Sequence, residues 1–79
     1  MRLDKYLKIS RIIKRRTIAN EACDSGRVTV NNKTAKASYD VKIGDQITIK
    51  LGNREIQIEV LSLNEYAKKD DAASMYKIL

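Results

Sequence analysis

The sequence contains no histidine, proline, tryptophan or phenylalanine, and its 79 residues include only one cysteine and three glycines. Without histidine, the chain lacks the commonest general base and metal ligand. The single cysteine, Cys23, excludes an intramolecular disulfide and a thiolate zinc site, and it suits a reducing compartment. The glycines form no phosphate-binding loop or nucleophile elbow. We therefore expect no catalytic residues, no metal and no cofactor, and we place Cys23 in the core.

Long apolar runs are also missing. No stretch approaches the roughly 18 apolar residues of a membrane span, and the N-terminus opens on charged residues rather than on the apolar segment of a secretory signal. We therefore expect a cytoplasmic protein that does not enter a membrane. The length predicts a single domain over residues 1–79 with one small core, which leaves no room for a separate catalytic domain.

Positive charge is abundant and unevenly distributed. Residues 1–16 hold seven basic side chains against Asp4 alone, so the whole net charge of +6 lies in this segment. Nine basic and nine acidic side chains balance in residues 17–79. Such a local excess indicates a polyanionic partner, for which RNA, DNA and an anionic membrane are candidates. The alternative interpretation is a basic face that only contacts solvent.

Two helices are expected in the N-terminal third. Leu3, Tyr6 and Leu7 share one stripe of a helix over residues 3–9, while basic side chains fall on a separate flank. Thr17 is the expected N-cap of a second helix that stops at Gly26. The residues expected to share one face of this second helix are Ile18, Ala19, Ala22 and Cys23.

After Gly26 the apolar period changes to two, which predicts strands. Val28 and Val30 alternate with polar residues, and a turn follows over Asn31, Asn32 and Lys33. Gly44 and Asp45 mark a further turn.

The segments "QITIKL" and "REIQIEV" flank Gly52-Asn53, which predicts a hairpin with Leu51 opposite Arg54. The same register places Ile49 opposite Ile56, Ile47 opposite Ile58 and, on the other face, Lys50 opposite Glu55.

The C-terminal segment "DDAASMYKIL" predicts a short helix, or a strand, with Tyr76 and either Ile78 or Leu79 docked on the core. Asp70 and Asp71 are interpreted as a helix start rather than as metal ligands. The predicted fold is therefore α+β, with two N-terminal helices packed on a small twisted, mostly antiparallel sheet and a short C-terminal element.

Four segments together resemble the S-four (alpha-L) RNA-binding domain, the module of ribosomal small-subunit protein four. They are "RLDKYL" at 2–7, "RTIANEACDSGRVTVNN" at 16–32, "KAS" at 36–38 and "VKIGD" at 41–45. Their order and spacing hold over residues 2–45. Three positions depart from the family pattern: Arg15 replaces a serine, Asn32 replaces the turn glycine and Ala37 replaces a proline.

Among members of this family, the chain is most similar to the short stand-alone proteins of ribosome-associated quality control. That resemblance implies a non-catalytic factor that binds rRNA and tRNA on stalled large ribosomal subunits and supports C-terminal alanine tailing of the nascent chain. The implied partners are large-subunit rRNA, the P-site peptidyl-tRNA and the tailing factor on the same subunit, and the expected state is a monomer.

Two alternatives stay open. A heat-shock-type member of the family would recycle stalled large subunits instead. An adaptor for an anionic membrane or an acidic protein would need an exposed apolar face on the first helix.

Eight basic residues are predicted to contact RNA. Arg2 and Lys5 lie one turn apart and can follow adjacent phosphates, whereas Arg16 adds its charge to the positive end of the second helix. The isoleucines at 12 and 13 are expected to anchor the joint between the helices. The predicted RNA-binding residues are Arg2, Lys5, Arg11, Lys14, Arg15, Arg16, Lys33 and Lys36. With four tyrosines as the only aromatic residues, recognition of RNA shape and backbone is expected.

Overall fold

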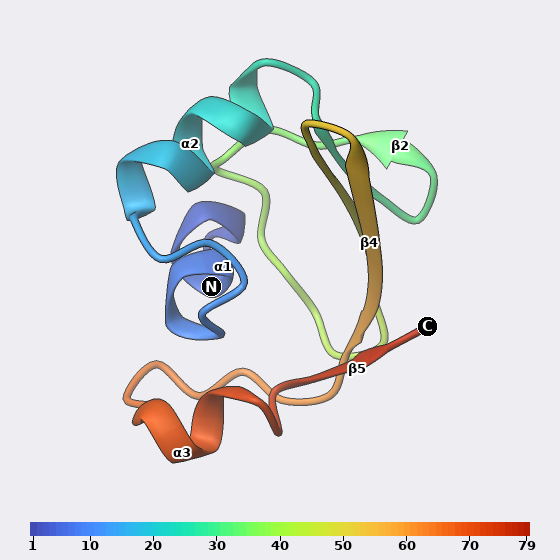
Figure 1. The fold of residues 1–79 in the computed structure, drawn as a ribbon. Helices are drawn as coiled ribbons and strands as arrows, with labels where there is room; N and C mark the ends of the chain where they lie inside the picture. Colours follow the sequence, from blue (N-terminus) through green and yellow to red (C-terminus); the bar gives the residue numbers. More distant parts are fainter.

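A computed structural model describes all 79 residues and places two helices on one face of a five-stranded antiparallel sheet, as Figure 1 shows. The strand order is β2-β1-β3-β4-β5. The elements are α1 (Leu3–Ile9), α2 (Arg16–Asp24), β1 (Val28–Val30), β2 (Lys33–Thr34), β3 (Gln46–Leu51), β4 (Arg54–Val60), α3 (Lys69–Ala72) and β5 (Tyr76–Ile78). This architecture confirms the predicted α+β class. Every helix is too short and too polar to cross a lipid bilayer.

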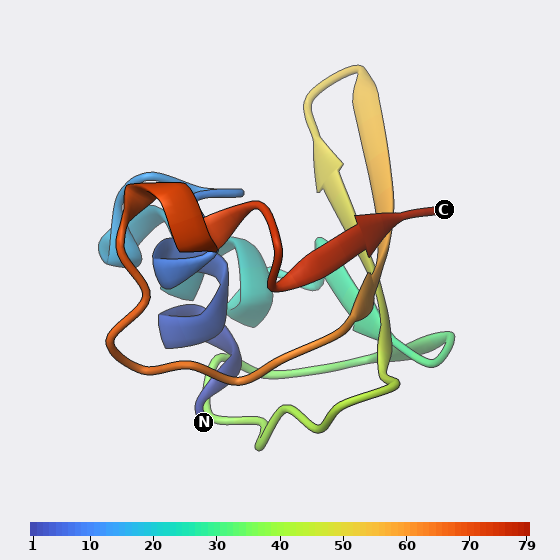
Figure 2. The same cartoon turned by 90° about the horizontal axis from the view of Figure 1, so that it is seen from below.

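Helix α1 is the centre of the core. Leu3, Tyr6 and Leu7 are completely buried, as their spacing predicts, and they pack under the sheet with the apolar residues of β3 and β4. The Tyr6 hydroxyl donates a hydrogen bond of 2.9 Å to the Met75 carbonyl oxygen. A residue of the first helix is thereby tied to the C-terminal segment, which lies beside α1 in Figure 2.

Helix α2 begins two residues earlier than predicted, and Thr17 is not its N-cap. Arg15 occupies the cap position with an extended backbone and no capping side chain. Ile18 is also wrongly placed by the sequence, because 48% of it is exposed. The buried stripe of α2 consists of the smaller residues Ala19, Ala22 and Cys23, which let α1 approach closely, and Ile18 lies one helical step to the solvent side.

The β3–β4 hairpin has the predicted register in full. Ile47 pairs with Ile58, Ile49 with Ile56, Lys50 with Glu55 and Leu51 with Arg54. The hairpin tip extends past the helices, as Figure 2 shows in yellow. The alternation of apolar and polar residues fixes this register, because a slip of one residue would turn the isoleucines to solvent.

The C-terminal segment forms both a short helix and a strand. Asp70 and Asp71 lie in the first turn of α3, as predicted. Beyond it, β5 pairs antiparallel with β4, and Tyr76 is half-buried against the core.

The prediction that Ile78 or Leu79 docks on the core is wrong, since 69% and 51% of these residues are exposed. Met75 fills the core instead. It lies immediately before β5, and the residues that follow it run outward along β4.

Candidate nucleic-acid interface

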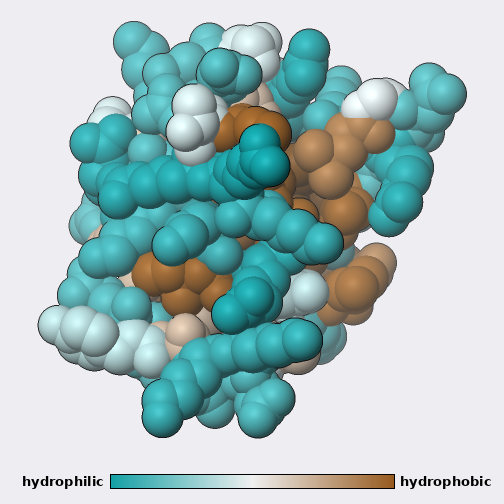
Figure 3. All heavy atoms as spheres, turned by 60° about the vertical axis from the view of Figure 1, so that its left-hand side comes forward, coloured by the Kyte–Doolittle hydropathy of each residue, from teal (hydrophilic) through white to brown (hydrophobic).

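The side of the molecule that carries α1, α2 and their connection is hydrophilic over most of its area (Figure 3). Lys5 is half-buried, and the other predicted RNA-binding residues are exposed. Six of the eight residues line three separate hollows in the surface, whereas Lys5 and Arg15 line none of them.

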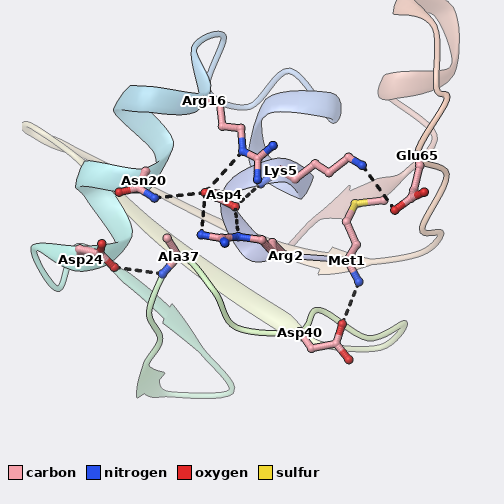
Figure 4. A network of polar contacts seen from close by, with 10 residues as sticks. All are labelled: Met1, Arg2, Asp4, Lys5, Arg16, Asn20, Asp24, Ala37, Asp40 and Glu65. Carbon is pink, nitrogen blue, oxygen red and sulfur yellow. Dashed lines mark hydrogen bonds and ion pairs between the residues drawn. The ribbon is translucent and has the colours of Figure 1, made fainter.

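The first hollow is organised by Asp4, which the sequence analysis counted only as a charge. The side chain of Asp4 is 3% exposed and accepts hydrogen bonds from Arg2 Nε at 3.2 Å and Asn20 Nδ2 at 3.2 Å. It also accepts the backbone N–H of Lys5 at 2.8 Å and pairs with Arg16 Nε at 3.5 Å. Figure 4 shows the two arginines reaching the carboxylate from different elements.

The electrostatics of Asp4 follow from these contacts. Burial alone raises the pKa of Asp4, but hydrogen bonds from Asn20, Arg2 and the Lys5 backbone, together with the charge of Arg16, outweigh it and hold the pKa below the ordinary 3.8. The carboxylate is therefore ionised at neutral pH. A buried carboxylate with this many partners is held in one position, and it orients the two arginine side chains that contact it.

Arg2 and Arg16 keep part of each guanidinium open to solvent. Their side chains are 51% and 48% exposed, and they border a surface hollow of about 520 Å³ together with Asp4, Thr17, Asn20 and Glu21. A guanidinium that is held by a carboxylate on one edge still offers N–H donors on its other edge. The geometry thus presents two oriented cations at the N-terminal ends of the two helices.

The connection between α1 and α2 forms the second hollow, of about 310 Å³. Ile13 is buried and Ile12 packs against the core, so the predicted anchoring of the joint is confirmed. Arg11 has a left-handed backbone with φ of 63°, which ends α1 and turns the chain. The residues that line this hollow are Lys8, Ile9, Arg11, Lys14, Glu65 and Ala67.

Lys8 joins Arg11 and Lys14 in this hollow, although the sequence analysis did not select it. The sequence did contain a signal for Lys8, because residues three positions apart on a helix, such as Lys8 and Arg11, are neighbours on its surface. Lys5, in contrast, forms an intramolecular ion pair with Glu65 at 3.4 Å, which neutralises part of its charge. Arg15 forms no hydrogen bond or ion pair through its side chain and is exposed.

Lys33 and Lys36 lie apart from the other cations. They line a third hollow beside β1 and β2, which shares no residue with the first two. The structure therefore brings together Arg2 with Arg16 and Arg11 with Lys14, and it separates Lys33 and Lys36 from both pairs.

The only thiol is buried in the core. Cys23 is 1% exposed, and burial, with smaller contributions from Asp4 and Asp24, raises its pKa to about 11. Because the thiolate is the reactive form, Cys23 is inert at neutral pH and serves as a core residue, as predicted.

Comparisons with known proteins identify the family of this chain. A family model described as the S4 domain matches residues 1–47. The chain is 54% identical over 79 residues to a Streptococcus pneumoniae protein named RQC P-site tRNA stabilizing factor, covering all of this chain and 90% of that protein. A Bacillus subtilis protein of the same name is 52% identical over 79 residues, with coverage of 100% and 92%.

Heat-shock relatives are more distant. A Haemophilus influenzae heat shock protein 15 homolog is 38% identical over 65 residues, which span 82% of this chain and 50% of that protein. The structure of Vibrio cholerae heat shock protein 15, described as trimeric, superposes with a TM-score of 0.93 at 32% identity, covering 100% of this chain and 81% of that one. The fold of a solved relative is thus the fold of this chain.

Proposed function

Because the chain belongs to the S4 domain family, we propose that it is a non-catalytic RNA-binding factor of ribosome-associated quality control. It binds the P-site tRNA together with rRNA on a stalled large ribosomal subunit. The names of its full-length relatives, RQC P-site tRNA stabilizing factor, support this role.

The observation that carries the proposal is the pair of arginines on one buried carboxylate. Asp4 holds Arg2 at 3.2 Å and Arg16 at 3.5 Å, so both side chains are oriented before RNA arrives. This preorganisation limits the side-chain entropy lost on binding. Each guanidinium can then grip a phosphate with two N–H donors, at a surface that carries the chain's excess of positive charge.

The proposed role in tailing follows from tRNA binding. A factor that holds the P-site tRNA on the large subunit keeps the end of the nascent chain in place while the tailing factor adds alanine residues. No chemistry is required of the chain itself, since its contribution is affinity and orientation. We propose that it acts in the cytoplasm, where stalled ribosomal subunits are found. We also propose that it acts as a monomer, because each copy contains the complete cluster of Asp4, Arg2 and Arg16.

Binding to large subunits that carry peptidyl-tRNA tests this proposal. Arg16→Ala and Arg2→Ala should each weaken binding by roughly 1–3 kcal/mol, measured by sedimentation with purified subunits. Lys50→Ala is the matched control, because Lys50 is exposed on the opposite face of the sheet and its loss removes one charge elsewhere. Equal binding by all three variants would place the interface on another surface.

A second candidate function is recycling of stalled subunits. The likeness to heat shock protein 15, with a TM-score of 0.93, supports it. A reconstituted reaction with the tailing factor separates the two roles. The tailing role requires that adding this protein lengthens the alanine tails, whereas the recycling role requires release of the tRNA without longer tails.

The membrane-adaptor alternative loses its main support. It requires an exposed apolar face on α1, whereas Leu3, Tyr6 and Leu7 are completely buried.

A further inference from the structure

The hollow beside β1 and β2 has the character of a binding site in its own right. Its volume is about 510 Å³, within the range of about 300–1,000 Å³ typical of small-molecule sites. One wall is the β1–β2 hairpin and the other is the turn that follows β2. The lining residues are Val30, Asn31, Lys33, Thr34, Ala35, Lys36, Ser38 and Tyr39.

Both walls are fixed by one carboxylate. Asp45 accepts the Tyr39 hydroxyl at 2.9 Å and Asn31 Nδ2 at 3.1 Å. Asn31 in turn accepts the backbone N–H of Gln46 at 3.0 Å through its Oδ1. The hairpin and the following turn are therefore held at a set distance, and the hollow exists before any ligand enters.

The lining chemistry suits an anionic ligand with a flat apolar part. The half-buried Tyr39 supplies aromatic surface, Val30 and Ala35 are buried at the base of the hollow, and Lys33 and Lys36 supply two positive charges. None of the lining residues is acidic. An aromatic side chain beside cations is the combination with which proteins bind an unpaired base and its phosphate.

Ser38 adds hydrogen-bonding capacity at the edge of the hollow. The Ser38 hydroxyl and backbone N–H form no hydrogen bond within the chain, and the residue is exposed. The turn is closed by the Tyr39 N–H, which donates to the Lys36 carbonyl oxygen at 3.0 Å. A serine hydroxyl and a backbone N–H at such a turn can contact phosphate oxygens or the edge of a base.

The same turn is joined to the proposed RNA-binding face. The Leu3 N–H donates to the Tyr39 carbonyl oxygen at 2.8 Å, and the Asp4 N–H donates to the Ala37 carbonyl oxygen at 3.2 Å. The turn therefore lies directly against the N-terminus of α1, where Arg2 and Asp4 are found. An RNA strand held by Arg2 can continue across this turn into the hollow.

We propose that this hollow binds one nucleotide, with the base against Tyr39 and the phosphate between Lys33 and Lys36. The inference rests on the proposed function in one respect, because the nucleotide is then an unpaired residue of the bound RNA. A free nucleoside monophosphate offers the same chemistry, so the source of the nucleotide is decided by experiment.

Amide chemical shifts of the full chain test the site directly. Adenosine monophosphate, a single-stranded RNA hexamer and inorganic phosphate are titrated separately. Saturable shifts at residues 31–39 with the hexamer or with adenosine monophosphate support the proposal, and the tighter of the two identifies the source. Shifts with inorganic phosphate that equal those with adenosine monophosphate would overturn it, because the base would then add nothing.

Variants locate the contacts. Lys36→Ala and Ser38→Ala should each weaken adenosine monophosphate about fivefold, whereas the control Lys50→Ala leaves its affinity unchanged. Tyr39→Phe keeps the ring but removes the hydrogen bond to Asp45, so it should weaken binding less than Tyr39→Leu, which removes both. If Tyr39→Leu does not fold, the lysine and serine variants decide the question, since both residues are exposed. Unchanged affinity in both variants would contradict the site.

The same spectra separate this inference from the proposed function. RNA that shifts amides of α1 and α2 but not those of residues 31–39 supports the general RNA-binding role and refutes the nucleotide site. Mononucleotide shifts at residues 31–39 that persist in an Arg16→Ala variant with weakened binding to ribosomal subunits would show that the nucleotide site does not depend on Arg16. Shifts in neither region with any of the three probes would refute the nucleotide site.

Discussion

Asp4 is the only acidic side chain among the first 16 residues, and its burial changes the meaning of the charge around it. We predict that Asp4→Asn weakens binding to large subunits even though it raises the net charge by one. The reason is that Arg2 and Arg16 lose the carboxylate that orients them. Sedimentation with subunits measures the effect. Tighter binding by this variant would show that total charge, not orientation, governs affinity.

Asp4 also predicts a pH dependence of stability. Its pKa is lower in the folded chain than in the unfolded chain, so the folded state binds fewer protons. The stabilisation is therefore present above the ordinary carboxyl pKa of 3.8 and is lost as pH falls through the lower folded value. Urea unfolding between about pH 2 and about pH 6 should show a steeper loss for the unchanged protein than for Asp4→Asn. Parallel curves would contradict this role.

At the scale of elements, the connection between α1 and α2 combines a backbone constraint with a charge. Arg11 adopts φ of 63°, a conformation that glycine adopts without the steric strain of a Cβ. We predict that Arg11→Gly stabilises the protein by about 1 kcal/mol in urea unfolding while weakening its binding to RNA.

Arg11→Ala is the matched control. It removes the same charge but keeps a Cβ at the left-handed position, so the backbone strain remains. Its RNA affinity should equal that of Arg11→Gly, while its stability should not rise. Wild-type RNA affinity in both variants would remove Arg11 from the interface.

One side-chain hydrogen bond joins the C-terminal segment to α1, beside the apolar packing of Met75. Tyr6→Phe removes the hydrogen bond to the Met75 carbonyl oxygen, which still accepts the Leu61 N–H at 2.8 Å. We therefore predict a loss of about 1 kcal/mol in the free energy of unfolding. Tyr66→Phe is the control, since Tyr66 is 87% exposed and should tolerate the change. Equal stability of the two variants would show that the tie contributes nothing.

At the scale of the whole molecule, the concentration of +6 in one region predicts a strong dependence of RNA affinity on salt. If about five phosphates are contacted, log K falls with log salt concentration with a slope of about −3.5 to −4.5. Between about 50 mM and about 200 mM salt, affinity should fall roughly 100- to 500-fold. Filter binding with an rRNA hairpin measures the slope, and affinity independent of salt would exclude phosphate contacts as the main source of binding.

The sequence by itself determined those features that depend on periodicity and turn chemistry. The stripe of Leu3, Tyr6 and Leu7 and the register of the β3–β4 hairpin are both found as predicted. Each arises from local repeats that permit one buried face and no other. The location of the net charge and the burial of Ile13 could also be predicted from the sequence.

Only the tertiary structure decided which charges act together. Asp4 looked like one anion among cations, yet it is buried because α2 brings Arg16 and Asn20 over it. The hollow beside β1 and β2 likewise depends on Asp45 meeting Tyr39 and Asn31 across the fold. Contacts between residues distant in sequence leave no repeating pattern in the chain. The partners of a polar side chain are therefore known only once the packing of the core has brought the helices and strands side by side.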